Sequence, residues 1–249
     1  ARFYLSLEDD LLRIFGSDRI SSIMERFGME EGEPIEHKLI SRGIENAQKK
    51  VEGHNFNIRK NLLEYDDVMN KHREIVYSLR KDILFARGIG EIVREMIDDK
   101  IDGIATLLIN PKDDPEDWNM DELRENLFRH FGFRVKVGPK DIGEDAFSQL
   151  KVEGLVELIK KQVQGVYEEK ERLFGKEELE HVERYILLQI IDDKWVAHLQ
   201  SMDHMKEGIG LRGYGQLDPL KEYQKEGFAL FAEFLEQIRE EALGHIFRL

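Results

Sequence analysis

The residues from Gly43 to Leu84 carry a repeating apolar pattern that constrains the fold more than any other part of the chain. The positions that recur in steps of three or four are Ile44, Ala47, Val51, His54, Ile58, Leu62, Tyr65, Met69, His72, Val76, Leu79 and Ile83. This period predicts one amphipathic helix whose apolar side contacts other helices. At about 1.5 Å per residue, the helix would be roughly 60 Å long. A helix of that length cannot bury its apolar side against itself, so it needs partners along its length.

The composition favours long helices over many short strands. The 249 residues include only five prolines, 35% of them are charged, and the mean hydropathy is -0.50. These values are typical of a soluble, charge-rich helical protein. The net charge of -14 argues against a general nucleic-acid binder, which needs a basic face. The chain has no cysteine, which excludes disulfides and cysteine-ligated zinc, and no apolar run approaches the ~18 residues of a membrane span.

The first residues are interpreted as the end of a domain that begins upstream. Residues 3–7 alternate like a short strand, and helices are predicted through Phe15 and over 18–27. One strand without a partner is not stable alone, so it is expected to belong to a sheet in a preceding part. The chain also opens on Ala1 without an initiator methionine. We therefore expect a fragment of a larger protein.

The middle of the chain, residues 85–175, is predicted to form a small helical domain inserted after the long helix. It has its own apolar residues, with helices expected at 91–108, 120–130, 141–150 and 152–174. Residues 131–137 alternate well enough to predict a brief strand. Residues 110–121 contain two prolines and an acidic cluster and are predicted to be a loop.

Residues 176–249 are predicted to form two antiparallel helices. The first presents two apolar sets, which are Leu188, Ile191, Trp195, Leu199 and Met202 and, separately, Leu179, Val182, Ile186 and Ile190. The second, from about Leu220 to Ile246, presents Phe228, Phe231, Leu235, Ile238 and Ala242, with Phe234 beside them. Asp218 is expected to cap it and Pro219 to fill its first position. The apolar sides suit each other and the long helix.

A glycine-rich segment from Gly208 to Leu217 joins these two helices. Its four glycines in eight residues are compatible with a simple flexible turn. The functional interpretation is a presented loop, in which Tyr214 offers an amphipathic ring and Arg212 a charge. Glycines would let the backbone approach an extended partner chain closely.

No catalytic motif accompanies this loop. The sequence contains no GxxxxGK[ST], HExxH or GxSxG pattern. The residues that could suggest a metal site are Asp192, Asp193, His198, Asp203 and His204. Because His198 and His204 are six apart, they lie on different sides of a straight helix, and ordinary polar helix faces are the expected interpretation.

Two further groups of polar residues lie on the long helix. Glu64, Asp66 and Asp67 diverge around a helix, so no carboxylate pair for acid–base work is expected. His54 and His72 are expected to be polar members of a helix interface, with a pH switch as the minor alternative.

Several stretches resemble the SecA family of bacterial preprotein translocase motors. The segments that resemble its scaffold helix are ENAQKKVE at 45–52, NFNIRK at 55–60 and LLEYDDVM at 62–69. The segment LRGY at 211–214, with Gln216 and Asp218-Pro219 after it, is similar to the tip of the family's two-helix finger. RFYL at 2–5 and RIFG at 13–16 resemble the end of its second nucleotide-binding domain. Residues 85–175 match its wing domain in position and helical character only.

The resemblance implies a mainly α fold in which a long scaffold helix packs against an antiparallel two-helix hairpin, with an inserted helical wing and a remnant of an α/β motor domain. The implied segments are 1–42 for the motor end and connector, 43–84 for the scaffold helix, 85–175 for the wing and 176–249 for the finger and the remaining scaffold. The residues assigned to packing of the scaffold helix are Ile58, Leu62, Tyr65, Met69, Val76 and Leu79.

The resemblance also implies a function. In the family, ATP is hydrolysed with magnesium between two RecA-like domains, and the finger contacts the polypeptide at the SecY channel. The corresponding tip residues are Leu211, Arg212, Gly213, Tyr214 and Gln216. The ATP-binding motifs and the zinc-binding tail of many members are not in this sequence. This portion is therefore expected to hold no cofactor or metal and not to hydrolyse ATP itself.

The implied partners are the SecY channel complex, an unfolded preprotein and the upstream motor domains, with a homodimer as a further candidate and no nucleic acid. The implied location is cytoplasmic, peripheral to the inner face of the bacterial membrane. Two alternatives stay open. One is a structural coiled coil that dimerises through residues 44–83, although the change of step at Leu62 fits unlike neighbours better. The other is a metal-dependent hydrolase using Asp192, His198 and His204.

Overall fold

The computed structural model describes residues 38–209 and 218–249. The strand predicted at 3–7, the two helices predicted before residue 28 and the expected remnant of a motor domain all lie outside these ranges. The chain divides into two compact units, residues 1–67 and 68–249, and the long helix belongs to both.

The described residues form helices and no strand, which confirms the mainly α prediction. The α-helices are α3 Lys38–Phe85, α4 Ile89–Leu108, α5 Met120–Phe131, α6 Pro139–Ile142, α7 Glu144–Ser148, α8 Val152–Phe174, α9 Lys176–Ile209 and α10 Pro219–Ile246. A short 3-10 helix, η1, covers Pro115–Asp117. With 48 residues, α3 is longer than the sequence pattern predicted. None of the helices in the described ranges is both long and apolar enough to cross a membrane.

The strand predicted at 131–137 is wrong. Phe131 ends α5, Gly132 follows with a left-handed φ of 73°, and residues 132–138 form no strand. Val135 and Val137 are buried, which explains the alternation. The backbone between them is held by one side chain, because the N–H of Lys136 donates to Oε1 of Gln162 at 2.8 Å and Nε2 of Gln162 donates to the Lys136 carbonyl at 2.8 Å. Gln162 of α8 therefore supplies the donor and the acceptor that a neighbouring strand would otherwise supply to this backbone.

The single helix predicted at 141–150 is replaced by two short helices, α6 and α7. Gly143 separates them with a φ of 95°, in the region that side chains disfavour. Gly138 is the N-cap residue of α6, and its N–H donates to Oδ2 of Asp141 at 2.9 Å. After the break at Gly143, Phe147 is buried in the core of this segment. Its ring meets that of Trp118 edge-on, with 6.2 Å between the ring centroids.

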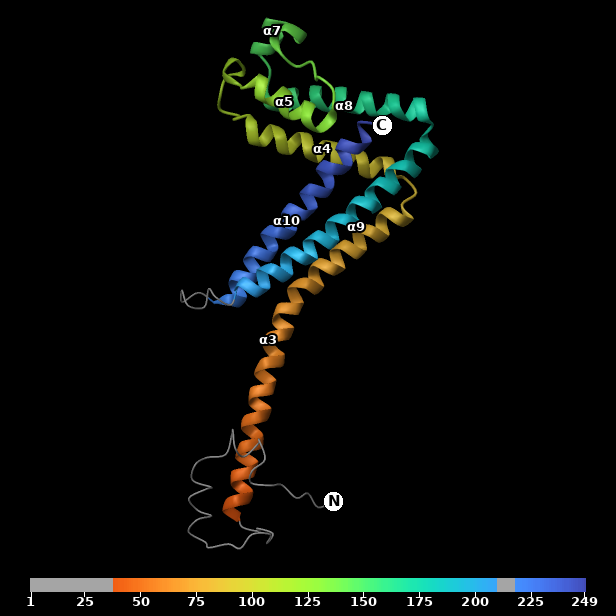
Figure 1. Cartoon of the computed structure of the whole chain (residues 1–249). Coiled ribbons are helices and arrows are strands. Elements are labelled where there is room, and N and C mark those ends of the chain that lie inside the picture. Colours follow the sequence, from red (N-terminus) through yellow and green to blue (C-terminus); the bar gives the residue numbers. More distant parts are fainter. Residues whose placement is uncertain (1–37, 210–217) are drawn as a thin grey trace. The chain divides into compact units, whose positions relative to one another are not determined.

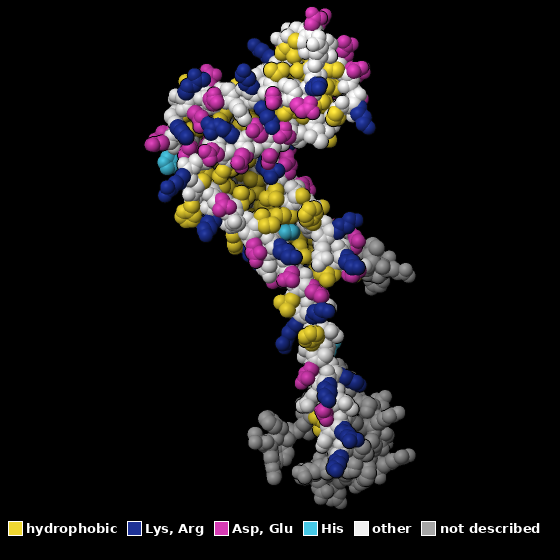
Figure 2. Space-filling view, turned by 180° about the vertical axis from the view of Figure 1, so that it is seen from behind, with side chains coloured by type: hydrophobic (Ala, Val, Ile, Leu, Met, Phe, Trp, Pro, Cys, Tyr) yellow, Lys and Arg dark blue, Asp and Glu magenta, His cyan; other side chains and the backbone are white. Residues whose placement is uncertain are grey.

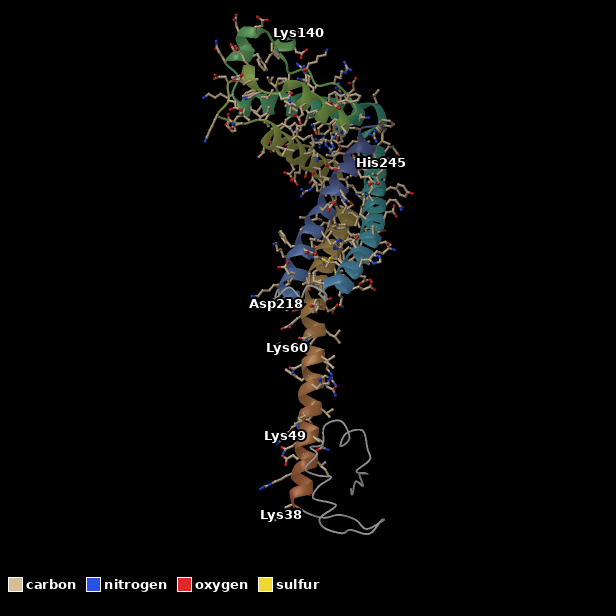
Figure 3. The ribbon with its side chains drawn as sticks, turned by 60° about the vertical axis from the view of Figure 1, so that its left-hand side comes forward. Lys38, Lys49, Lys60, Lys140, Asp218 and His245 are labelled. Carbon is tan, nitrogen blue, oxygen red and sulfur yellow. The ribbon has the colours of Figure 1, made fainter. Side chains whose placement is uncertain are left out.

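One hydrophobic cluster runs through residues 68–249. In the predicted wing, α4 packs on α5 and on α8, and α10 contacts α4 and α5 as well as α9 (Figure 1). Helices α9 and α10 lie side by side and run in opposite directions, as predicted for the hairpin. Asp218 and His245 mark the two ends of α10 (Figure 3). The cluster includes Leu123 and Leu155 of the wing and Ile191 and Phe231 of the hairpin.

The apolar sides of the two hairpin helices differ in part from the prediction. In α10, Phe228 was expected in line with the buried side but is 74% exposed. The buried residues are Tyr223, Gly227, Phe231, Phe234, Ile238, Ala242, Leu243, Gly244 and Ile246. In α9, Val182 was expected in an apolar set but is exposed. Its neighbour Glu183 is buried in its place.

Candidate functional site

The predicted tip lies between α9 and α10, outside the described residues. Its members are Leu211, Arg212, Gly213, Tyr214 and Gln216. The described flanks are the end of α9 at Ile209 and the start of α10 at Pro219. Since the two helices are antiparallel neighbours, residues 210–217 connect adjacent helix ends (Figure 1).

The start of α10 is held by a side-chain cap. The N–H of Leu220 donates to Oδ1 of Asp218 at 3.0 Å, and Pro219 lies in the first turn, where it has no N–H to leave unpaired. Both assignments made from the sequence are confirmed. The cap defines where the loop ends and the rigid helix begins.

The base of the hairpin is closely packed. Ile209 and Tyr223 are buried, and Gly227 lies where α10 approaches α9 and α3. A Cβ at Gly227 would lie 3.1 Å from Cε of Met202 and 3.3 Å from Cγ1 of Val68. The missing side chain thus allows three helices to meet at this level. This packing holds the ends of α9 and α10 together.

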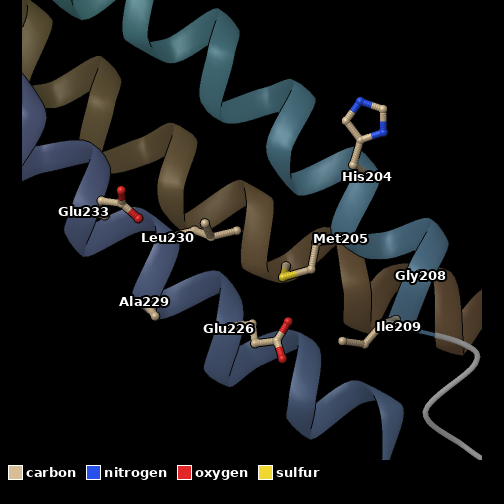
Figure 4. A pocket seen from close by; sticks show the side chains of 8 residues that line it. All are labelled: His204, Met205, Gly208, Ile209, Glu226, Ala229, Leu230 and Glu233. Atoms are coloured by element: carbon tan, nitrogen blue, oxygen red, sulfur yellow. The ribbon is translucent and has the colours of Figure 1, made fainter.

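An open cavity of about 570 Å³ lies on the hairpin near the loop (Figure 4). Its lining residues are His204, Met205, Gly208, Ile209, Glu226, Ala229, Leu230 and Glu233. The apolar groups come from both helices, and the two carboxylates come from α10. Such a surface suits an apolar side chain followed by a positively charged one.

A histidine pair lies deeper in the hairpin. Nε2 of His198 on α9 is 3.2 Å from Nδ1 of His72 on α3, so one ring nitrogen donates to the other. The ring of His72 stacks on Phe231 at 4.2 Å. Burial lowers the pKa of His72, and burial together with the nearby His72 lowers the pKa of His198 to about 4. His72 is therefore a polar member of a helix interface, as expected, whereas His54 is exposed.

The residues considered for a metal-dependent hydrolase are not brought together. Asp192 accepts two hydrogen bonds from Arg80 at 2.9 and 3.1 Å, and Asp193 accepts from Gln189. His198 is buried with His72, while His204 is exposed at 3.9 Å from Glu207. Among the described residues, no three histidine or carboxylate side chains are arranged to share a metal ion.

A buried carboxyl group, Glu183, lies where the wing joins the hairpin. The hydroxyl of Tyr167 on α8 donates to its Oε1 at 2.7 Å, and Oε2 has no hydrogen-bond partner. Burial raises the pKa of Glu183 to about 7 and raises that of Tyr167 above its usual range. Arg94 of α4 lies over the Tyr167 ring at 5.1 Å and pairs with Glu171.

The next residue of α9 ties the hairpin to the end of the long helix. Arg184 donates to the carbonyl oxygens of Leu84 at 3.4 Å and Ala86 at 2.8 Å. These carbonyls lie at the C-terminus of α3, where a cation is favourable. Glu183 therefore contacts α8, and Arg184 contacts the end of α3 and the residue after it.

The residues assigned to packing of the long helix differ in exposure. Val76 is buried and Leu79 packs against the core of the 68–249 unit. Tyr65 and Met69 are partly buried, while Ile58 and Leu62 are 45% and 56% exposed. Hydrophobic side chains lie at the surface of this part of α3 between basic and acidic ones (Figure 2).

Two charged side chains in helix contacts were missed from the sequence: Glu183, and Lys100 of α4, which bonds Glu236 and Glu240 of α10. Glu183 stands four residues from both Leu179 and Leu187, so its place in an apolar helical period was the available signal. Lys100 was missed because its partners, Glu236 and Glu240, lie 136 and 140 residues away. No local pattern marks such a contact.

The fold and the site define a mainly α-helical protein in which a capped two-helix hairpin packs on further helices. The chain belongs to the SecA family: residues 34–249 match the model described as the SecA wing and scaffold domain, and residues 1–32 match the SecA P-loop domain.

Related sequences extend over the whole chain. Proteins described as protein translocase subunit SecA are 49% identical in Desulforapulum autotrophicum over 252 residues and 46% identical in Syntrophobacter fumaroxidans over 249, each match covering all of this chain and 29% of the relative. The one from Geobacter metallireducens is 48% identical over 247 residues, covering 99% of this chain and 27% of the relative. The chain thus spans less than a third of the length of these relatives.

Proposed function

We propose that this chain is the scaffold, wing and two-helix finger of an ATP-driven motor that moves preproteins through the SecY channel. The long helix and the wing hold the finger, α9 and α10, and the loop at its end contacts the moving polypeptide. The observation that carries the proposal is the antiparallel hairpin itself, capped at Asp218 and packed at its base around Gly227. A rigid pair of helices is suited to push on a chain through a short loop.

The tip assignment rests on residue chemistry. Tyr214 supplies a ring that can contact any polypeptide through its apolar faces and its hydroxyl. Leu211, Arg212, Gly213 and Gln216 surround it in sequence. The cavity beside Met205 and Leu230 offers an apolar surface next to this loop. Together they suit a partner without a fixed sequence.

The exposed apolar residues on the first part of α3 are proposed to pack against motor domains of the intact protein. Phe56, Ile58, Leu62 and Leu63 are all exposed there. Residues 1–32, which match a P-loop domain, precede them in the chain. The intact motor would bind ATP and magnesium in those domains, and this portion would take part in the work without hydrolysing ATP.

The proposed partners are the SecY channel complex, the unfolded preprotein and the motor domains. The proposed location is the cytoplasmic face of the bacterial membrane, where the protein is peripheral. A uniform coiled-coil dimer along residues 44–83 is less favoured, because Val76, His72 and Ile83 are already buried within the 68–249 unit. A homodimer through other surfaces stays compatible with the proposal.

The test is Tyr214→Ala in the full-length motor, with Tyr185→Ala as the matched control. Tyr185 is a 69% exposed tyrosine on α9, away from the loop. Truncating an aromatic contact of this size costs about 2 kcal/mol, so translocation should slow roughly tenfold or more in Tyr214→Ala and stay unchanged in Tyr185→Ala. Translocation at the unmodified rate in Tyr214→Ala would refute the tip assignment.

A further inference from the structure

Helix α10 is held by two different neighbours. It lies along α9 within the hairpin, and its C-terminal half also contacts α4 and α5 of the wing (Figure 1). The far end of α10 enters the wing core, where Ile246 and Phe247 are buried. The ring of Phe247 meets Phe131 edge-on at 5.0 Å. The wing therefore contacts the same helix that begins at the proposed finger tip.

Lys100 of α4 makes the polar part of this contact. Its side chain is 9% exposed, and its ammonium nitrogen lies 2.7 Å from Oε1 of Glu236 and 2.6 Å from Oε1 of Glu240. Burial alone would lower the pKa of Lys100, but the hydrogen bonds and charges of the two carboxylates raise it above its usual value. Lys100 therefore remains charged inside the contact.

The two carboxylates need this cation. Glu236 and Glu240 are four residues apart, so they face each other on one side of α10, and like charges at this spacing destabilise a helix. One ammonium group that bonds both of them removes the repulsion and ties this side of α10 to α4. His130 of α5 lies 4.0 Å from Oε1 of Glu240, and Arg239 lies 3.7 Å from Oε2 of Glu236. Burial and the Lys100 charge lower the pKa of His130, so it supplies little charge at neutral pH.

We propose that Lys100 is a positioning residue through which the wing sets the orientation of α10, and with it the direction of the finger. This role rests on the proposed function of the finger, although the orientation itself can be measured without translocation. A purely apolar contact at Phe247 would hold the end of α10 but would leave its rotation weakly specified, whereas directional bonds to a charged group specify it.

The hairpin contains a matched control pair. Lys194 of α9 bonds Glu241 of α10 at 2.6 Å, so it is also a lysine–glutamate contact to α10. It ties α10 to α9 and not to the wing. Lys194→Met therefore makes the same chemical change as Lys100→Met on the same helix.

The experiment measures the distance between spin labels placed at Lys161→Cys on α8 and Lys221→Cys on α10, both exposed. The chain has no cysteine of its own, so labelling is specific. Lys100→Met should broaden or shift the distance distribution, while Lys194→Met should leave it unchanged. Amide exchange over residues 236–246 should become roughly tenfold faster in Lys100→Met, because a hydrogen bond to a charged group is lost.

The charge swap Lys100→Glu with Glu236→Lys and Glu240→Lys completes the test, because it reverses all three charges and leaves no like charges facing each other between α4 and α10. It rebuilds an ion pair between α4 and α10 and should restore the narrow distance distribution. If Lys100 acted only through packing of its aliphatic stem, the swap would not restore it. An unchanged distribution in Lys100→Met, an equal effect of Lys194→Met, or no recovery in the swap would each overturn the proposal. The distance does not depend on what the finger touches, so failure of the Tyr214 assignment would leave this result intact.

Discussion

Glu183 of α9 is a buried carboxyl group whose surroundings set its protonation. Its carboxyl group is fully buried, shares one hydrogen bond with Tyr167 and leaves its second oxygen without a partner. The charged form is disfavoured there, because desolvation outweighs the single bond and the nearby Arg94. Near neutral pH the group is therefore close to half protonated.

The first residue-scale prediction concerns the pH dependence of stability. The pKa of Glu183 is about 7 in the folded chain and 4.5 as the ordinary value. A raised carboxyl pKa means that the folded state binds the proton more tightly, so stability falls as pH rises from about 4.5 to 7. Replacement by the neutral isostere, Glu183→Gln, should remove that fall. Relative to Glu183→Gln, the native chain should lose on the order of 3 kcal/mol across this range.

The measurement is the free energy of unfolding in urea at a series of pH values. His72 and His198 have lowered pKa values, so their effect on stability is opposite to that of Glu183: because of them, the folded chain loses stability as pH falls below 6.5. Comparing two variants cancels that contribution. Glu178→Gln, an exposed change on the same helix, is the control and should run parallel to the native chain. If the curve of unfolding free energy against pH for Glu183→Gln also ran parallel to that of the native chain, the raised pKa of Glu183 would be excluded.

At the scale of single elements, the sequence predicted helices well where local signals were strong. The boundaries of α8 and α10 agree closely with the expected 152–174 and 220–246. The cap at Asp218 and the proline after it act within a few residues, so local chemistry suffices to place them.

The element-scale prediction tests this cap. Asp218→Ala removes the acceptor for the Leu220 N–H and should lower the free energy of unfolding by about 1 kcal/mol, whereas Asp218→Asn keeps an acceptor and should lose much less. Urea unfolding of the two variants beside the native chain measures the difference. Equal stability of all three would show that the cap contributes nothing to α10.

Which side of a helix is buried was harder to predict. Phe228 was expected to face inward and is 74% exposed, while Glu183 and Gly227 are buried. The reason is that three helices meet at Gly227, and a backbone contact of that kind selects a small residue instead of a large apolar one. The hydrophobic period predicts which side of a helix is buried on average, but it does not predict where two helix backbones come close together.

At the scale of the whole molecule, residues 68–249 share one hydrophobic cluster. The predicted wing, 85–175, contributes to it together with α9 and α10, and Phe247 lies against Phe131. This continuity predicts that wing and finger unfold together.

The two tryptophans make this testable. Trp118 lies in the wing and Trp195 on α9, so Trp118→Phe and Trp195→Phe each leave one reporter. Urea unfolding followed by fluorescence should give the two variants the same slope. The midpoints should also agree once each is corrected for the stability change that its substitution causes, because a shared core unfolds in one step. Two well-separated midpoints would instead indicate an independently folding wing.

The sequence by itself determined the helical class, the long helix, the cap of α10 and the resemblance to the SecA family, since each depends on residues close together in the chain. Only the tertiary structure decided that His72 meets His198, that Lys100 bonds Glu236 and Glu240, and that Gln162 holds the segment predicted as a strand. These contacts join residues 26 to 140 positions apart. Local patterns specify a helix and its apolar side, but which helices meet, and in which rotation, depends on packing the whole core at once.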